Sequence, residues 1–311
     1  MKDKFIVSVS PHLHKDESVS KIMWMVVISL IPAGLAGVFI FGLNALWLIV
    51  LGIVSALFTE AVLQILTKRK ITVLDGSAFI TGLLLAYNLP PHVPFWLPIV
   101  GSFFSVAIGK QVFGGLGQNI FNPALVGRVF LMASWPKHMT AFTKPFDAVT
   151  SATPLALLKE GKLIENISYL DLLLGKRGGC IGEVCIIALL LGAIFLLVRG
   201  YISWHIPVTY IATTGIFTYI FGPERLFFGD WLFHILSGGL ILGAFFMATD
   251  YVTSPLTRKG QIIFGIGCGI ITAVIRLWGG YPEGASYAIL MMNAATPIID
   301  RYTKNRVYGI K

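Results

Sequence analysis

Long apolar stretches alternate with short polar ones along nearly the whole of this chain. An apolar stretch of roughly 17 to 25 residues can cross the hydrocarbon core of a bilayer as a helix, and the absence of water there obliges the backbone to satisfy its own hydrogen bonds. With glycine, proline and charge taken as boundaries, the pattern predicts ten membrane helices, over residues 22–42, 45–66, 77–89, 95–112, 120–135, 181–199, 204–222, 231–248, 262–279 and 284–300.

The ten stretches form two groups of five, residues 22–135 and 181–300, separated by the longest polar interval, residues 136–180. An odd number of crossings reverses the direction of the second group, as in an inverted repeat. Residues 77–94 and 238–255 can be aligned, which sets Gly82 over Gly243, Asn88 over Thr249 and Pro94 over Pro255. We therefore predict an all-α integral membrane protein of two inverted five-helix repeats. Three stretches, 77–89, 120–135 and 284–300, are short and are expected to be tilted, broken or enclosed by protein.

Composition agrees with a membrane protein, since 56% of the 311 residues are apolar and only 13% are charged. The formal charge of +9 does not indicate a nucleic-acid partner, because the basic residues flank apolar stretches instead of forming a long run. Their distribution favours cytoplasmic ends, residues 1–21 and 301–311, and an external 136–180 segment. The polar N-terminal segment does not have the pattern of a cleaved signal peptide.

The three cysteines, Cys180, Cys185 and Cys268, match no common zinc spacing, so we predict no metal centre. We interpret them as small apolar residues. A Cys180–Cys185 disulfide and a metal site shared at a subunit contact remain open alternatives.

A glycine-rich segment, residues 109–132, contains Asn119, Asn122 and Arg128. Glycine allows close backbone approach, and asparagine can hold a polar guest inside a membrane. Tight helix packing around a kinked entry explains the same pattern. Arg128 lies within a predicted helix, where an unpaired charge is costly. It is a candidate either for contact with an anion or for a structural ion pair.

Several carboxylates are candidates for an ion path. Glu60 and Arg276 lie nearer the ends of predicted helices and could extend toward the interface; Glu60 could instead serve a cation path or pair with a base. Asp250 is followed by hydroxyl residues, a combination that suits a hydrated cation and equally a capped turn. Asp75 and Asp300 are further candidates by position.

The stretch FDAVTSATPLALLKEG, residues 146–161, is unusually polar for this chain. Pro154 suits the first position of a helix, LALLKE reads as a short helix, and Gly161 reads as its end. Thr153 then becomes the N-cap, and a phosphate on its oxygen would lie beside unpaired N–H groups and the positive end of the helix dipole. An ordinary cap without phosphate is the alternative.

The string DAVTSAT, residues 147–153, resembles the acceptor signature of flavin transferases, in which the last threonine receives FMN through a phosphoester bond. Here Ser151 stands where glycine is most usual. The resemblance extends over nearly the whole chain, through SPHLHKDESVSKIM, GGLGQNIFNPALVGRVFLM, SATPL, MATDYVTSPLT and GYPEGASYAILMMNAATPIIDRYT, to the D subunits of the Rnf membrane ferredoxin:NAD oxidoreductase. That family is shared with the B subunits of the Na⁺-translocating NADH:quinone reductase.

The resemblance implies a ten-helix, urea-transporter-like fold in the cytoplasmic membrane of a bacterium or archaeon, with Thr153 on the external side. It implies FMN on Thr153, with Asp147, Thr150, Ser151 and Ala152 as the string that the flavin transferase recognises. For the flavin environment we select Asn119, Asn122 and Arg128. Riboflavin is a second cofactor in the quinone-reductase branch, and no motif here places one.

The implied function is electron transfer between ferredoxin and NAD, coupled to Na⁺ or H⁺ translocation, together with the A, B, C, E and G subunits of the Rnf complex. Glu60 and Asp250 are selected for the ion path. Two other classes are kept beside it: a small-solute channel or carrier, which the duplicated halves would suit, and an assembly scaffold without a cofactor.

Overall fold

The computed structural model describes residues 18–143, 150–151, 153–159, 168–222 and 226–304. The described residues are overwhelmingly helical, as the apolar pattern predicts. The longer helices are α1 (Val19–Phe41), α2 (Leu43–Leu66), α3 (Ser77–Tyr87), α4 (Trp96–Val106), α5 (Pro123–Ser134), α9 (Ile186–Val198), α10 (His205–Ile220), α13 (Arg258–Trp278) and α14 (Ala285–Tyr302).

Short elements connect these helices. They are η1 (Val73–Asp75), η2 (Ala107–Gln111), α6 (Pro136–Met139), α7 (Pro154–Lys159), α8 (Tyr169–Leu174), α11 (Trp231–Leu236), α12 (Leu240–Leu242) and η3 (Gly243–Met247), with strands β1 (Phe142–Thr143) and β2 (Thr150–Ser151). The strands pair antiparallel, Phe142 opposite Ser151. Among the described helices, α1, α2 and α13 are long and apolar enough to span a membrane, with mean hydropathies of 2.3, 2.3 and 1.8.

Two predicted helices differ from the observed ones. The stretch 231–248 is not one helix: it breaks between α11 and α12, where Gly238 has a left-handed φ of 69°. The stretch 181–199 becomes helical only at Ile186. Its first residues instead bond to the end of α3 and the chain that follows it, through Gly182 N–H to Tyr87 O at 2.9 Å and Ile181 N–H to Leu89 O at 3.0 Å. Tertiary hydrogen bonds therefore replace helical ones at both places.

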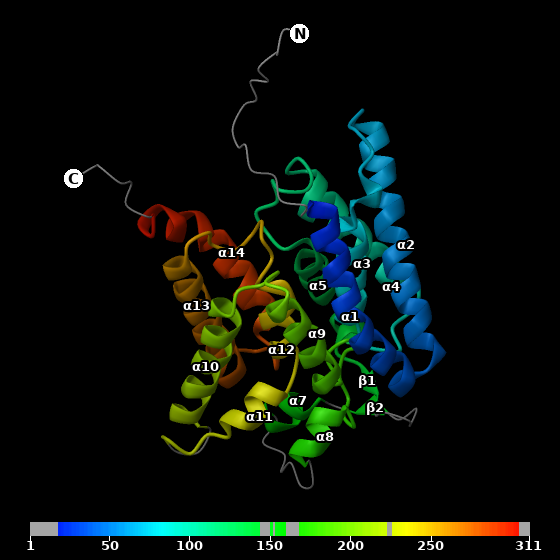
Figure 1. Cartoon of the computed structure of the whole chain (residues 1–311). Helices are drawn as coiled ribbons and strands as arrows, with labels where there is room; N and C mark the ends of the chain where they lie inside the picture. Colours follow the sequence, from blue (N-terminus) through cyan, green and yellow to red (C-terminus); the bar gives the residue numbers. More distant parts are fainter. Residues whose placement is uncertain (1–17, 144–149, 152, 160–167, 223–225, 305–311) are drawn as a thin grey trace, which may run out of the picture.

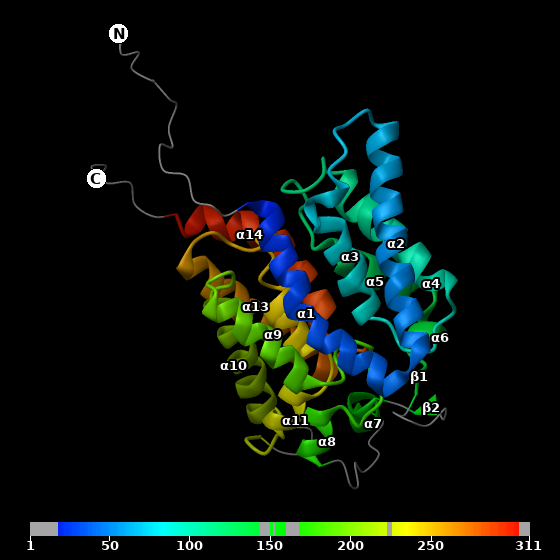
Figure 2. The same ribbon diagram turned by 45° about the vertical axis from the view of Figure 1, so that its right-hand side comes forward.

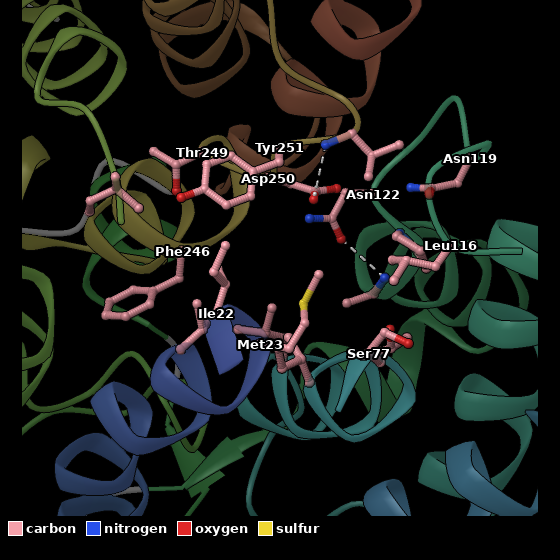
Figure 3. Close-up of a pocket in the computed structure, with 18 of the residues that line it drawn as sticks. Ile22, Met23, Ser77, Leu116, Asn119, Asn122, Phe246, Thr249, Asp250 and Tyr251 are labelled. Carbon is pink, nitrogen blue, oxygen red and sulfur yellow. Dashed lines mark hydrogen bonds between the residues drawn. The ribbon is translucent and has the colours of Figure 1, made fainter. Parts of the chain in front are cut away.

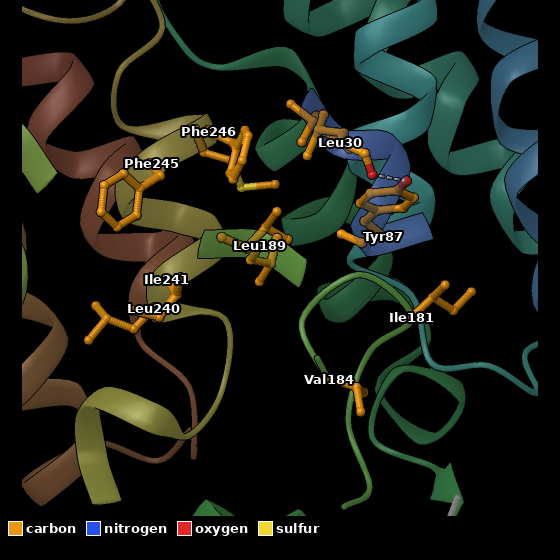
Figure 4. Close-up of a cluster of buried hydrophobic side chains, with 14 of the residues drawn as sticks. Leu30, Tyr87, Ile181, Val184, Leu189, Leu240, Ile241, Phe245 and Phe246 are labelled. Atoms are coloured by element: carbon orange, nitrogen blue, oxygen red, sulfur yellow. Dashed lines mark hydrogen bonds between the residues drawn. The ribbon is translucent and has the colours of Figure 1, made fainter. Parts of the chain in front are cut away.

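The core lies where the two halves of the chain meet. Helix α1 packs on α9 across the two halves, while α2 packs on α3 and α4 within the first half and α10 on α13 within the second. Figure 4 shows side chains from both halves in one cluster: Leu30 and Tyr87 face Leu189, Ile241 and Phe246. The Tyr87 hydroxyl donates to Leu30 O at 2.8 Å, which satisfies a polar group buried in this apolar cluster.

The start of α1 and the end of α14 lie at one end of the bundle (Figure 1). Helices α7, α8 and α11 lie at the other end, together with β2. Figure 2 shows the same separation after a turn of the molecule. The segment around Thr153 therefore lies at the opposite end of the bundle from the start of α1 and the end of α14.

Candidate functional site

Thr153 joins β2 to α7 and caps the helix. Its Oγ1 accepts a hydrogen bond from Ala156 N–H at 3.2 Å, and its carbonyl oxygen accepts from Leu157 N–H at 3.0 Å. The predicted N-cap and the short helix after Pro154 are thus confirmed. Thr153 is 4% exposed, so its hydroxyl is packed against protein. The predicted end of the helix at Gly161 lies outside the described residues.

Helix α7 is held to the second half of the chain by a lysine and a leucine. Lys159 Nζ donates to Ile275 O at 3.2 Å and to Tyr281 O at 2.7 Å. Partial burial lowers the pKa of Lys159 from its ordinary value. Leu155 is buried against the break between α11 and α12, because a Cβ on Gly238 would lie 2.9 Å from Leu155 Cδ1. On the other side, β2 is tied to β1, which follows α6.

The remaining residues of the predicted acceptor string are only partly described. Asp147 and Ala152 lie outside the described residues. Thr150 and Ser151 form β2, whose backbone pairs with β1. The strand pairing and α7 thus hold Thr153 from both directions along the chain.

A group of buried charges lies around the break between α11 and α12. Arg128 donates to Glu283 Oε2 at 2.6 Å and also to Asn88 Oδ1. Arg276 donates to Ser237 O at 3.0 Å and to His234 O. Arg276 therefore does not point outward from the end of α13, as the sequence allowed: the carbonyls released by the helix break hold it among protein, at 5% exposure.

Two further residues of this group of buried charges, Arg177 and Glu183, precede α9. Arg177 donates to Glu183 O at 3.3 Å, and a Glu183 carboxylate oxygen accepts from Cys180 N–H at 2.9 Å. Sequence reasoning passed over both, although an ionisable residue next to a predicted membrane helix is itself a signal. The three cysteines are free thiols.

Glu60 is fully buried in the bundle and does not reach the interface, contrary to one of the sequence-based alternatives. Lys110 Nζ lies 2.6 Å from Glu60 Oε1, and Gln64 and Gln111 donate to the same oxygen. Lys110 also donates to Ser77 Oγ at 2.6 Å. Lys110 is therefore the interior ion-pair partner of Glu60.

A cavity of about 90 Å³ opens between the two halves, near the start of α1 (Figure 3). Asn119, Asn122 and Asp250 line it together with Lys110. Asn122 caps α5 by accepting from Ala124 N–H at 3.1 Å, and its amide donates to Met247 O at 3.2 Å. Asn119 donates to Phe121 O at 3.1 Å.

The three residues selected for the flavin environment are therefore separated. Asn119 and Asn122 are at the cavity, whereas Arg128 lies about one and a half turns further along α5, with Glu283. The cavity is near the start of α1, and α7 is at the other end of the bundle (Figures 1 and 3). The structure does not bring the two asparagines to Thr153.

The acidic candidates differ in their surroundings. Asp250 accepts from Val252 N–H at 3.4 Å and from the Thr253 hydroxyl at 3.1 Å, which is the capped-turn arrangement. Asp75 accepts from Ser77 N–H at 2.8 Å, and Asp300 from Leu256 N–H at 3.1 Å. Within the described ranges, no group of three or more His, Cys, Asp or Glu residues could hold a metal ion.

A bundle of apolar helices with buried ion pairs, and with a capped threonine at one end, defines a helical integral membrane protein. Comparison with known families matches residues 6–309 to the NQR2, RnfD, RnfE family, and the chain belongs to that family.

Three curated relatives are aligned over most of their length. The chain is 54% identical, over 98% of its length and 95% of theirs, to the D subunit of the Na(+)-translocating ferredoxin:NAD(+) oxidoreductase complex of Acetobacterium woodii. It is 51% identical, over 100% of its length and 98% of the relative's, to the D subunit of the proton-translocating ferredoxin:NAD(+) oxidoreductase complex of Clostridium ljungdahlii. It is 38% identical, over 94% of its length and 92% of the relative's, to the D subunit of the ion-translocating oxidoreductase complex of Stutzerimonas stutzeri.

Proposed function

We propose that this chain is the FMN-carrying membrane subunit of an Rnf-type complex, in which it relays electrons between ferredoxin and NAD while Na⁺ or H⁺ is translocated. Its partners are the A, B, C, E and G subunits of that complex. The observation that carries the proposal is Thr153: the last residue of the acceptor string is also the N-cap of α7, in a chain of the family to which the Rnf D subunits belong.

The surroundings of Thr153 fit a phosphoester. A phosphate on Oγ1 would stay beside Ala156 N–H and the positive end of α7, where negative charge is stabilised. Asp147, Thr150, Ser151 and Ala152 are the recognition string for the flavin transferase. Because Thr153 is 4% exposed, the transferase acts before α7 packs against Gly238. FMN supplies transfer of one or two electrons when bound, and the chain holds it in place.

The test is mass spectrometry of the peptide 146–161, together with flavin fluorescence of the denatured protein, purified from cells with an active flavin transferase. We expect an added FMN, lost in Thr153→Ala. Thr257→Ala is the matched control, because Thr257 caps α13 in the same way, accepting from Gly260 N–H at 3.0 Å. Each substitution should lower the free energy of unfolding by about 1 kcal/mol, because each removes a helix cap. Only Thr153→Ala should remove the flavin.

An unmodified Thr153 peptide would contradict this proposal. If such a protein conducted small solutes in liposomes, the channel alternative would replace it. Normal electron transfer by an unmodified Thr153→Ala complex would instead favour an assembly scaffold.

We extend the proposal to a topology of ten crossings in two inverted repeats, urea-transporter-like, with both ends cytoplasmic and Thr153 external. The two halves share an order of contacts that supports it. Helices α2 and α4 pack together as α10 and α13 do, and α4 packs on α5 as α13 packs on α14. Pro94 and Pro255 each precede the start of the long fourth helix of their half by two or three residues.

Riboflavin, the second flavin of the quinone-reductase branch, is not assigned to the cavity between the halves. The cavity volume of about 90 Å³ is well below the roughly 300 Å³ at which small-molecule pockets begin.

For the coupling ion we propose Glu60 and Asp250. Asp250 lines the cavity, and Glu60 pairs with Lys110, which also lines it. Two relatives of nearly equal identity to this chain are named for Na⁺ and for proton translocation. The coupling ion is therefore identified by measuring ion uptake at varied sodium concentration. Glu60→Gln and Asp250→Asn should slow ion uptake by vesicles and leave the covalent flavin intact. Asp300→Asn is the control and should not slow ion uptake, because the Asp300 carboxylate accepts a structural hydrogen bond from Leu256 N–H.

A further inference from the structure

Five charged side chains, four of them buried and Glu283 partly buried, converge on the break between α11 and α12. Arg128 comes from α5, Arg276 from α13, and Glu283 precedes α14, while Arg177 and Glu183 precede α9. The three arginines are each 5% exposed, Glu183 is 2% exposed and the Glu283 side chain 13%. Three positive and two negative charges leave a net charge of +1 when all are ionised. We call these five residues the charge cluster.

The two glycines of the break lie inside the charge cluster. A Cβ on Gly238 would lie 3.0 Å from Glu283 Oε1 and 3.1 Å from Arg276 Nη2. A Cβ on Gly239 would lie 2.8 Å from Glu183 Oε2 and 3.6 Å from Arg128 Nη1. All five charges therefore belong to one region, since Arg177 interacts electrostatically with Glu183, Glu283 and Arg276.

Structural pairing accounts for only part of the charge cluster. Arg128 with Glu283, and Arg276 on the carbonyls of the break, satisfy polar groups that the fold leaves unpaired. Yet Arg177 Nε and Nη1, Arg276 Nε, Glu183 Oε2 and Glu283 Oε1 have no hydrogen-bond partner among the described residues. Burying charges with incomplete pairing lowers stability compared with apolar residues. Ionisable groups inside membrane proteins generally serve function.

The charge cluster lies next to α7, the helix that Thr153 caps. The same Cβ position on Gly238 that meets Glu283 and Arg276 lies 2.9 Å from Leu155 Cδ1. Leu155 follows Thr153 by two residues, which is about 3 Å along a helix axis. Thr153 and Leu155 are each 4% exposed, so water is largely excluded from their side chains. Charge effects are weakly screened in such surroundings.

We propose that the charge cluster sets the electrostatic potential at the flavin carried on Thr153, and so raises the affinity of that flavin for electrons. The inference rests on the proposed function, because it requires FMN on Thr153. The net positive charge stabilises the phosphate and the negative charge that reduction adds to the ring. The five side chains are positioning residues in this role, acting through the field and not through contact with the reacting atoms.

The experiment is a redox titration of the covalent flavin, followed by its absorbance in the purified complex. Glu283→Gln and Glu183→Gln each remove a negative charge and should shift the flavin potential upward. At a fixed potential, the ratio of oxidised to reduced flavin should then fall several-fold. Arg177→Gln and Arg276→Gln each remove a positive charge and should shift the flavin potential downward. Loss of packing alone would not produce shifts of opposite sign.

Two controls separate charge from damage. Arg258→Gln makes the same substitution at the exposed, opposite end of α13 and should leave the potential unchanged. Arg177→Lys keeps the charge and should restore the wild-type potential. Glu283→Gln is nearly isosteric, so it remains informative if the arginine variants fail to assemble.

Shifts of one sign in all four variants, or no shift in Glu283→Gln that retains its covalent flavin, would overturn the inference. Absence of flavin from Thr153 in wild-type protein would instead overturn the proposed function, so mass spectrometry of that peptide precedes every titration.

Discussion

Individual interior charges in this chain find partners far away in the sequence. Arg128 was expected to need a partner, because an unpaired charge inside a membrane helix is costly. Its partners are Asn88 and Glu283, which lie 40 and 155 residues away. No local pattern specifies such pairs. The alternative of structural ion pairing is therefore confirmed for Arg128, and the pairing of Glu60 with Lys110 follows the same rule.

The Glu60–Lys110 pair makes a prediction about stability. Lys110→Met should lower the free energy of unfolding by about 3 to 5 kcal/mol, because it leaves the Glu60 carboxylate buried without a cation. Adding Glu60→Gln should recover much of that loss. Thermal unfolding of the detergent-solubilised protein measures both, and losses that simply add would contradict a coupled pair.

At the scale of single elements, apolar length predicts where helices occur but not where an apolar stretch breaks. Helices α1 and α2 begin within three residues of the predicted starts. The stretch 231–248 is equally apolar, yet it breaks at Ser237–Gly239. The break is stabilised by Arg276, a residue distant in sequence, which donates to the carbonyls of His234 and Ser237 that a continuous helix would occupy.

Close packing of α2 on α3 makes a second prediction. A Cβ on Gly82 would lie 2.5 Å from Gly52 O and 2.8 Å from Ile53 Cα, both backbone atoms that cannot turn aside. Gly82→Ala should therefore destabilise the protein by about 1 to 3 kcal/mol, although alanine is the better helix former.

The matched control is Gly280→Ala, because a Cβ on Gly280 would meet nothing within 4 Å. Thermal midpoints in detergent compare the two variants. Equal midpoints would show that α2 and α3 do not approach as closely as this packing requires.

At the scale of the whole molecule, α7, which Thr153 caps, lies at the opposite end of the bundle from the start of α1 and the end of α14 (Figure 1). This separation agrees with the topology expected from charge, in which residues 1–21 and 301–311 are cytoplasmic and the 136–180 segment is external. The assignment of the two ends to sides of a membrane stays a prediction.

Labelling tests that assignment. In a variant lacking Cys180, Cys185 and Cys268, the exposed positions Lys176 and Lys304 are each replaced by cysteine. A membrane-impermeant maleimide should label Lys176→Cys in intact cells, because it lies beside α8 at the same end as α7. Lys304→Cys should react only after permeabilisation. Labelling of both, or the reverse order, would contradict the proposed orientation.

The sequence by itself determined the class of protein, the places of most helices and the cap at Thr153, because apolar length and capping are local properties. It also indicated the family through DAVTSAT and the longer motifs. Only the tertiary structure decided that Asn119 and Asn122 line one cavity with Asp250, and that Arg128 joins Glu283 near α7. Those groupings depend on how segments distant in the sequence pack together. A buried charge takes its hydrogen-bond and ion-pair partners from the segments that pack around it.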